Sequence, residues 1–191
     1  ALKWYKENTG KDNTDLRLTI DHYGVYTPDQ LKRTADMKIW ASIQPIFRPQ
    51  WNRPNGIFEK RLGHDRWTRC VPIGTLYKAG IPVSLGSDLP SGVSFDPRPG
   101  IHSCLDGMGQ SGEIITAYQA IKGYTIEAAR RLLRDHEVGS IEVGKLADFV
   151  VLNLDPLQIP KEQIWNDAKN APSDLKVEYT IVGGKVVYKT K

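Results

Sequence analysis

The sequence has little cysteine and no long apolar run, and both absences exclude classes of protein. Two cysteines, Cys70 and Cys104, occur among 191 residues, whereas disulfide-stabilised domains are short and rich in cysteine. No stretch approaches the roughly 20 apolar residues that a membrane-spanning helix needs. The chain shows no signal peptide and begins without methionine, in what reads as a helix over residues 1–9. We expect a cytoplasmic protein with buried or neutral thiols and no membrane partner. We also expect a further segment upstream, so the absence of a signal peptide carries little weight.

A strong excess of charge of either sign is also absent. Lysine and arginine total 26 against 22 aspartate and glutamate residues, which gives a net charge of +4. The basic residues are spread along the chain, whereas nucleic-acid-binding arms carry dense basic runs. The contents of 40% hydrophobic and 25% charged residues are those of an ordinary globular domain. We therefore expect no nucleic-acid partner.

The first 140 residues contain strand-like and helix-like segments in alternation. Three strands are predicted: an alternating one at residues 16–22, a short apolar run typical of a buried strand at residues 39–44, and a third at residues 82–87. Thr27, Pro28 and Gln30 form the pattern of a helix start with a capping box, and a second helix is predicted from residue 65 to residue 79. Such alternation predicts adjacent parallel strands that are joined by helical crossovers. Two helices, at about 113–122 and 126–135, are expected to follow.

After Gly139 the pattern changes from mixed to β. Three further strands are predicted, and Gly183-Gly184 between the last two is a two-residue hairpin signal; the strands cover residues 147–152, 177–182 and 185–189. We therefore divide the chain into an α/β part, residues 1–140, and a small β-domain, residues 141–191.

Three polar residues stand where the predicted parallel strands end: His22, Gln44 and Asp88. Because active groups of parallel barrels gather at the carboxyl ends of strands, we expect their side chains to converge. Histidine and carboxylate are good ligands for Zn²⁺, and a metal acidifies a bound water whose proton a nearby carboxylate can accept. Each residue also has a structural explanation. A lone histidine is more often a loop or core residue, an aspartate in Gly-Ser-Asp is more often a turn residue or helix cap, and Gln44 could simply satisfy backbone groups.

The segment 45–63 is rich in proline and glycine and reads as a long loop, a kind of segment that is usually functional or disordered. It carries Arg48, Trp51 and Arg53, which could form a lid that holds an anionic or amide group of a substrate. The alternative is a solvated loop that is pinned by one tryptophan. The remaining histidines are weaker candidates for a site: His64, His102 and His136.

Several segments resemble the amidohydrolase superfamily, and within it the branch that includes N-substituted formamide deformylases. Residues 18–22 resemble the segment RIEHA, residues 41–45 the strand ASMQP, residues 79–88 the segment AGVPLALGSDAP, and residues 139–152 the segment GSLEPGKLADLVVL. Residues 182–188 resemble the closing hairpin. The matches cover nearly the whole chain in the order of the family, so together they are specific.

This resemblance implies the last strands, about six to eight, of a (β/α)₈ TIM-type barrel, followed by part of a small β-sandwich. It implies that His22 binds a metal, that Asp88 binds the metal and acts as the general base, and that Gln44 lies near the substrate. The histidine pair of strand one, the lysine or glutamate of strand four and the histidine of strand five have no counterparts here. Asp21 and Tyr23 also replace the usual residues beside the histidine. We therefore expect the missing amino-terminal part of the barrel as a partner that completes the ligand set.

Two functional interpretations follow. The first is a metal-dependent hydrolase, with a divalent metal such as Zn²⁺, that cleaves amide or other C–N bonds of a small-molecule substrate. In this interpretation the 191 residues are inactive by themselves. The alternative is a non-catalytic binding or structural module that retains the amidohydrolase fold. Open strand edges invite pairing with another chain, so we also expect the isolated chain either to associate as a homo-oligomer, by dimerisation or strand exchange, or to be poorly soluble.

Overall fold

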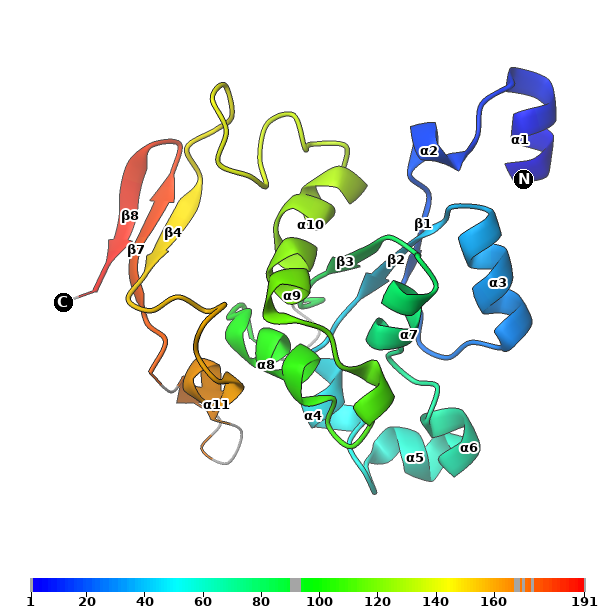
Figure 1. The fold of residues 1–191 in the computed structure, drawn as a ribbon, viewed down its shortest axis with the longest axis horizontal. Helices are drawn as coiled ribbons and strands as arrows, with labels where there is room; N and C mark the ends of the chain where they lie inside the picture. Colours follow the sequence, from blue (N-terminus) through cyan, green and yellow to red (C-terminus); the bar gives the residue numbers. More distant parts are fainter. Residues whose placement is uncertain (1, 90–93, 167–168, 170, 173, 191) are drawn as a thin grey trace.

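The computed structural model describes residues 2–89, 94–166, 169, 171–172 and 174–190. Two three-stranded sheets and one two-stranded sheet organise these residues (Figure 1). The larger two are a parallel sheet surrounded by helices and, at the side of the carboxyl terminus, an antiparallel sheet. The amino terminus and α1 lie at the opposite side of the molecule. No helix of the described part has the length and apolar character that crossing a membrane requires.

The parallel sheet has the order β1-β2-β3 and consists of β1 (Thr19–Asp21), β2 (Trp40–Ile43) and β3 (Val83–Leu85). Its register aligns Ala41 with Val83 and Ile43 with Leu85. All four of these side chains are at most 4% exposed, which is why the sequence shows continuous apolar runs rather than alternation. The order and parallel pairing of the strands are as predicted, but β1 is shorter than the predicted strand at residues 16–22, because Leu16 ends α2 and Arg17 is left-handed.

The helix between β1 and β2 begins as its sequence predicts. The Thr27 hydroxyl oxygen accepts a hydrogen bond from the Gln30 backbone N–H, and the Gln30 side chain accepts one from the Thr27 N–H. Pro28 occupies the first turn of α3 (Pro28–Asp36). Upstream lie α1 (Leu2–Thr9), none of whose residues is buried, and the single turn α2 (Asn13–Leu16).

The prediction of a single helix over residues 65–79 is wrong, because the helical conformation is interrupted between residues 67 and 73. Pro72 has no N–H to donate and Val71 adopts a φ of +49°, which a helix does not contain. The segment between β2 and β3 instead forms four short helices: α4 (Phe47–Trp51), α5 (Ile57–Leu62), α6 (His64–Trp67) and α7 (Ile73–Lys78). The predicted long loop at residues 45–63 therefore contains helical turns.

After β3 the chain forms one helix that the sequence analysis missed and two that it placed approximately. These elements are α8 (Arg98–Asp106), the 3₁₀ turn η1 (Ser111–Glu113), α9 (Ala117–Tyr124) and α10 (Ile126–Arg131). The start of α8 was not predicted because it contains Pro97, Pro99 and Gly100, which are typical of loops. Proline is nevertheless tolerated in a first helical turn. Gly123 lets α9 approach β3 closely, because a Cβ there would lie 2.6 Å from Leu85 Cγ.

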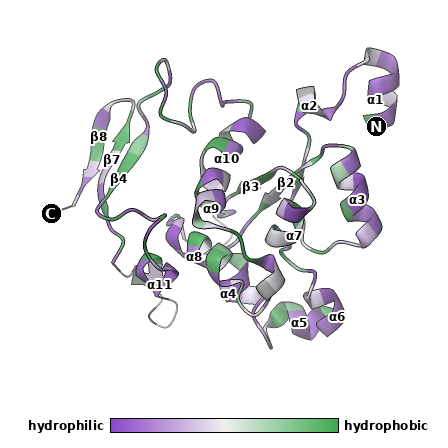
Figure 2. Ribbon diagram, viewed as in Figure 1, coloured by the Kyte–Doolittle hydropathy of each residue, from purple (hydrophilic) through white to green (hydrophobic). Residues whose placement is uncertain are grey.

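The antiparallel sheet has the order β4-β7-β8, and its strands are β4 (Phe149–Leu152), β7 (Val177–Val182) and β8 (Lys185–Lys189). Gly183 and Gly184 both have positive φ, as the tight hairpin requires. Figure 2 shows hydrophobic residues along these strands, and side chains such as Val150, Val186 and Val187 are more than half exposed. A short helix, α11 (Lys161–Ile164), and the pair β5 (Trp165–Asn166) and β6 (Ala171–Pro172) lie between β4 and β7.

Gly74 in α7 occupies a position where a side chain does not fit. A Cβ atom there would lie 2.6 Å from the Gly112 carbonyl oxygen and 2.7 Å from Glu113 Cα. We expect Gly74→Ala to lower the free energy of unfolding by about 1–3 kcal/mol, measured by urea denaturation, even though alanine favours helix. Gly112→Ala is the control, because its Cβ would meet nothing within 4 Å. Equal stability of Gly74→Ala and the unaltered protein would contradict this packing of α7 on η1.

Candidate functional site

The candidate site lies where the parallel strands end. His22 directly follows β1, Gln44 directly follows β2, and Asp88 stands three residues beyond the end of β3. The Gly86 N–H donates a 3.0 Å hydrogen bond to the Ile43 carbonyl oxygen, which holds the chain beside β2 past the last residue of β3. Since β1 and β3 both run parallel to β2, all three residues lie at the carboxyl-terminal end of the strands, which we call the carboxyl edge of the sheet.

The His22 side chain is in contact with two residues that follow β2. Its Nδ1 lies 2.9 Å from Gln44 Oε1, and its ring stacks on Phe47 with 6.1 Å between centroids and an interplanar angle of 13°. Gln44 is only 6% exposed, while His22 is exposed. The sequence analysis missed Phe47, whose place about one helical turn after Gln44 was the available signal.

His22 and Asp88 share an uncommon backbone conformation. Their φ angles are +69° and +58°, in the left-handed region that few non-glycine residues adopt, although histidine and aspartate are enriched there. The conformation costs roughly 1–2 kcal/mol for a residue with a Cβ atom. Such backbone strain clusters at functional sites, where the surrounding structure maintains it.

The donor set of this edge fits a divalent metal but is incomplete. Imidazole and carboxylate are the ligands that zinc takes besides thiolate, and His22 and Asp88 supply one of each. The neighbouring Asp21 carboxylate instead pairs with Arg131 of α10 at 2.5 Å. Within the described part of the chain, no group of three His, Cys, Asp or Glu residues could hold a metal ion, and catalytic zinc usually takes three protein ligands.

Arg48 does not lie on a lid, which corrects the expectation that it contacts a substrate. It is fully buried, and its guanidinium donates hydrogen bonds to three backbone carbonyl oxygens, those of Val71 at 2.8 Å, Glu113 at 3.1 Å and Ser103 at 3.3 Å. Burial lowers the pKa of Arg48, yet guanidinium groups keep their charge in proteins. Arg48 therefore joins α4 to the segments before α7, in α8 and at η1, out of reach of a bound molecule.

Trp51 belongs to a row of aromatic rings that begins at His22. Its ring centroid lies 4.6 Å from that of Phe47 and 6.2 Å from that of Phe58 in α5. Trp51 is partly buried. It packs α4 against α5 and supports the ring on which His22 stacks, and it stays a weak candidate for contact with a substrate.

The other histidines and the cysteines have their own surroundings. His64 and His136 are exposed and lie beside Glu59 and Glu137, whereas His102 is buried in α8. Both cysteines are buried and free. Burial raises the pKa of the Cys70 thiol to about 11 and that of Cys104 to about 12, so neither is a nucleophilic thiolate near neutral pH.

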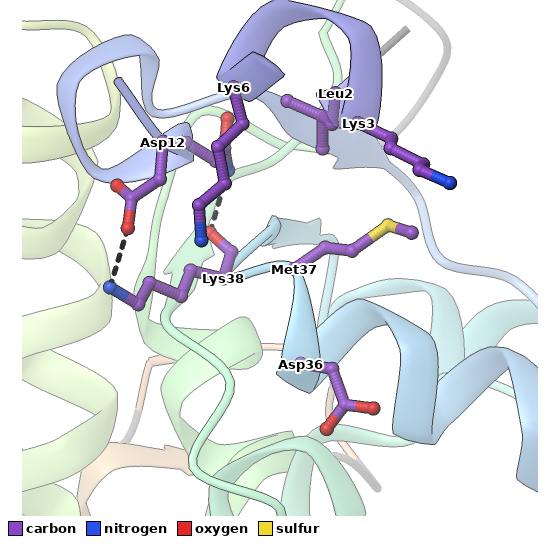
Figure 3. A pocket seen from close by; sticks show the side chains of 8 residues that line it. Leu2, Lys3, Lys6, Asp12, Asp36, Met37 and Lys38 are labelled. Atoms are coloured by element: carbon purple, nitrogen blue, oxygen red, sulfur yellow. Dashed lines mark hydrogen bonds and ion pairs between the residues drawn. The ribbon is translucent and has the colours of Figure 1, made fainter. Parts of the chain in front are cut away.

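A hollow of about 400 Å³ lies at the other end of the parallel strands (Figure 3). Its lining includes Asn13, which precedes β1, and Met37 and Lys38, which precede β2. Lys38 reaches Asp12 at 2.8 Å, and its hydrogen bond holds the pKa of that carboxyl well below the usual range. Because it faces the amino ends of the strands, away from His22, Gln44 and Asp88, we assign no chemistry to it.

Comparison with known proteins gives consistent matches. The Amidohydrolase family model matches residues 3–188. The chain is 28% identical over 195 residues to the N-substituted formamide deformylase of Arthrobacter pascens, covering 98% of this chain and 34% of that protein. It is 33% identical over 138 residues to an imidazolonepropionase of Acinetobacter baumannii, covering 72% and 30%. The chain thus spans about a third of the length of these curated relatives.

A solved structure shows the same fold. An uncharacterized metal-dependent hydrolase from Pyrococcus furiosus superposes with a TM-score of 0.64 at 26% identity, over 73% of this chain and 29% of that one. The α/β fold is accordingly related to the TIM barrel. With a family match over almost its whole length, this chain belongs to the amidohydrolase family.

Proposed function

We propose that the protein containing this chain is a metal-dependent hydrolase that cleaves an amide or another C–N bond of a small molecule. The observation that carries the proposal is the placement of His22 and Asp88 after β1 and β3, the two parallel strands that flank β2, both in the left-handed conformation. The family match and the relatives that act on C–N bonds support it.

In this proposal His22 and Asp88 hold a divalent cation, for which Zn²⁺ suits the donor set. When bound, the metal polarises the carbonyl group and makes water more acidic. Asp88 accepts a proton from the water as its oxygen bonds to the carbonyl carbon. The C–N bond then breaks, and Asp88 returns the proton to the departing nitrogen, so atoms and charge balance.

The rest of the ligand set would come from the remaining part of the barrel. We propose that β1, β2 and β3 are strands six, seven and eight of that barrel. β1 and β3 each pair with one neighbour among the described residues. A hollow of about 330 Å³ borders β1 at Ile20 and Asp21, and another of about 600 Å³ borders β3 at Val83. These edges are where the other strands would join.

The antiparallel sheet has its own place in this proposal. Residues 141–191 form a small β-domain whose exposed apolar side chains on β4, β7 and β8 pack against further strands of a composite sandwich. This arrangement accounts for valines such as Val186 and Val187, which are 59% and 62% exposed, since apolar side chains gain stability on burial. Without those strands, the isolated chain would associate through its open edges.

The metal content of the complete protein tests the proposed function. Elemental analysis of the purified protein is expected to find a divalent metal in stoichiometric amount, and His22→Ala is expected to lose most of it because one direct ligand disappears. His64→Ala is the matched control, since His64 is exposed and pairs with Glu59; this variant should keep its metal. A metal-free unaltered protein would favour the alternative, a non-catalytic module with the amidohydrolase fold.

A further inference from the structure

We infer that Gln44 is a positioning residue, which fixes the tautomer and the orientation of the His22 imidazole and so presets Nε2 as the metal-binding atom. The role of the metal in this inference rests on the proposed function, whereas the tautomer of His22 is a property of the chain itself. Gln44 thereby acts on a metal ligand rather than directly on a substrate.

The contact between His22 and Gln44 selects one tautomer of the imidazole. His22 Nδ1 lies 2.9 Å from Gln44 Oε1, and an amide oxygen can only accept a hydrogen bond. The proton of the neutral imidazole must then reside on Nδ1, from which it is donated to Gln44. Nε2 is left with its lone pair, which is the form that binds a metal. Metal-binding histidines commonly donate their other N–H in this way.

Among the described residues, His22 contacts Gln44 and Phe47, both of which follow β2. It is exposed and follows β1, a strand of three residues with one neighbour in the described chain. Its φ of +69° also places it outside the regular strand geometry. An exposed side chain in such a position is free to change rotamer, so its orientation must come from contacts with the residues that follow β2.

The residues around Gln44 are well packed. Gln44 is 6% exposed and directly follows β2, whose Ala41 and Ile43 are completely buried. Phe47 stacks on the face of the imidazole at an interplanar angle of 13°, and Trp51 supports Phe47 from the next turn of α4. The hydrogen bond thus fixes the edge of the ring while the stack fixes its plane, which is the preorganisation that a metal ligand needs.

The test uses the complete protein with ¹⁵N-labelled histidine, in variants that remove or retain the acceptor. In the metal-free protein, long-range ¹H–¹⁵N spectra report the tautomer of His22, whose signals are assigned by their loss in His22→Ala. The unaltered protein and Gln44→Glu, which keeps an acceptor oxygen, should show the proton on Nδ1. Gln44→Met, which has similar length and no acceptor, should show mixed tautomers. Its affinity for zinc, measured by competition with a chelator, should fall about 10- to 100-fold.

Gln158→Met is the matched control, because Gln158 is exposed and distant in sequence; it should change neither the tautomer nor the affinity. A His22 proton on Nε2 in the unaltered protein, or a Gln44→Met variant with unchanged tautomer and unchanged zinc affinity, would overturn the inference. A protein that binds no zinc but whose His22 tautomer still depends on Gln44 would support the positioning role while refuting the proposed function.

Discussion

Replacing Asp88 with asparagine in the complete protein is expected to lower turnover by at least 100-fold while leaving the fold intact. Asparagine has nearly the same shape as aspartate but cannot accept the proton of the attacking water at neutral pH. Loss of a general base alone costs about 10²- to 10⁴-fold in rate, and Asp88 is also proposed to hold the metal. The side chain is exposed at the edge of the sheet, so its replacement should disturb little packing.

The measurement is kcat for hydrolysis of an N-substituted amide that the unaltered protein cleaves, with circular dichroism as the check of folding. Asp29→Asn is the matched control, because Asp29 is an exposed carboxylate in the first turn of α3, 3.6 Å from Arg33. Its turnover should stay within a factor of two of the unaltered protein, which is about 0.4 kcal/mol. Full activity of Asp88→Asn would remove Asp88 from the mechanism.

Arg48→Met is expected to lower the free energy of unfolding by about 3 kcal/mol or more. Methionine fills much of the volume of the arginine stem but cannot donate to the carbonyl oxygens of Val71, Ser103 and Glu113. Each buried acceptor that loses a partner costs about 1–3 kcal/mol, although Val71 and Ser103 keep one backbone donor each. Chemical denaturation of the complete protein measures the change.

Arg53→Met is the control that distinguishes the loss of the Arg48 hydrogen bonds from a general loss of positive charge. Arg53 follows α4 and is exposed, and surface substitutions of this kind usually change stability by less than about 0.5 kcal/mol. Arg48→Lys should be intermediate, since lysine keeps the charge but not the planar fork of donors. If Arg48→Met proved as stable as Arg53→Met, Arg48 would not be the link between α4 and the later segments that its hydrogen bonds indicate.

The strands could be predicted from the sequence because their patterns are local. The apolar run at residues 39–43 marks β2, and the glycine pair after Val182 fixes the ends of β7 and β8. The helices between β2 and β3 were harder to predict. The sequence indicates one helix from residue 65 to residue 79, but Pro72 and the positive φ of Val71 interrupt it. The conformation of Val71 depends on tertiary packing, which the local sequence does not show.

In the candidate site, too, local patterns could be predicted and long-range contacts could not. His22, Gln44 and Asp88 could be assigned to one end of the sheet because parallel strands bring their carboxyl ends together, while their roles at a site stay a prediction. Arg48 was placed wrongly because the prolines and glycines around it indicate an exposed loop. Its partners stand 23, 55 and 65 residues away along the chain, a separation at which local composition carries no information. Phe47 was missed for a similar reason, since its stacking on His22 depends on the pairing of β1 with β2.

Anomalous X-ray diffraction from crystals of the complete protein, recorded at the absorption edge of its bound metal, tests the central claim most directly. The account predicts an anomalous peak at the carboxyl edge of the parallel sheet, about 2.0–2.2 Å from His22 Nε2 and from a carboxylate oxygen of Asp88. A peak bound only by other residues, or bonded to His22 through Nδ1 with Gln44 displaced, would contradict it.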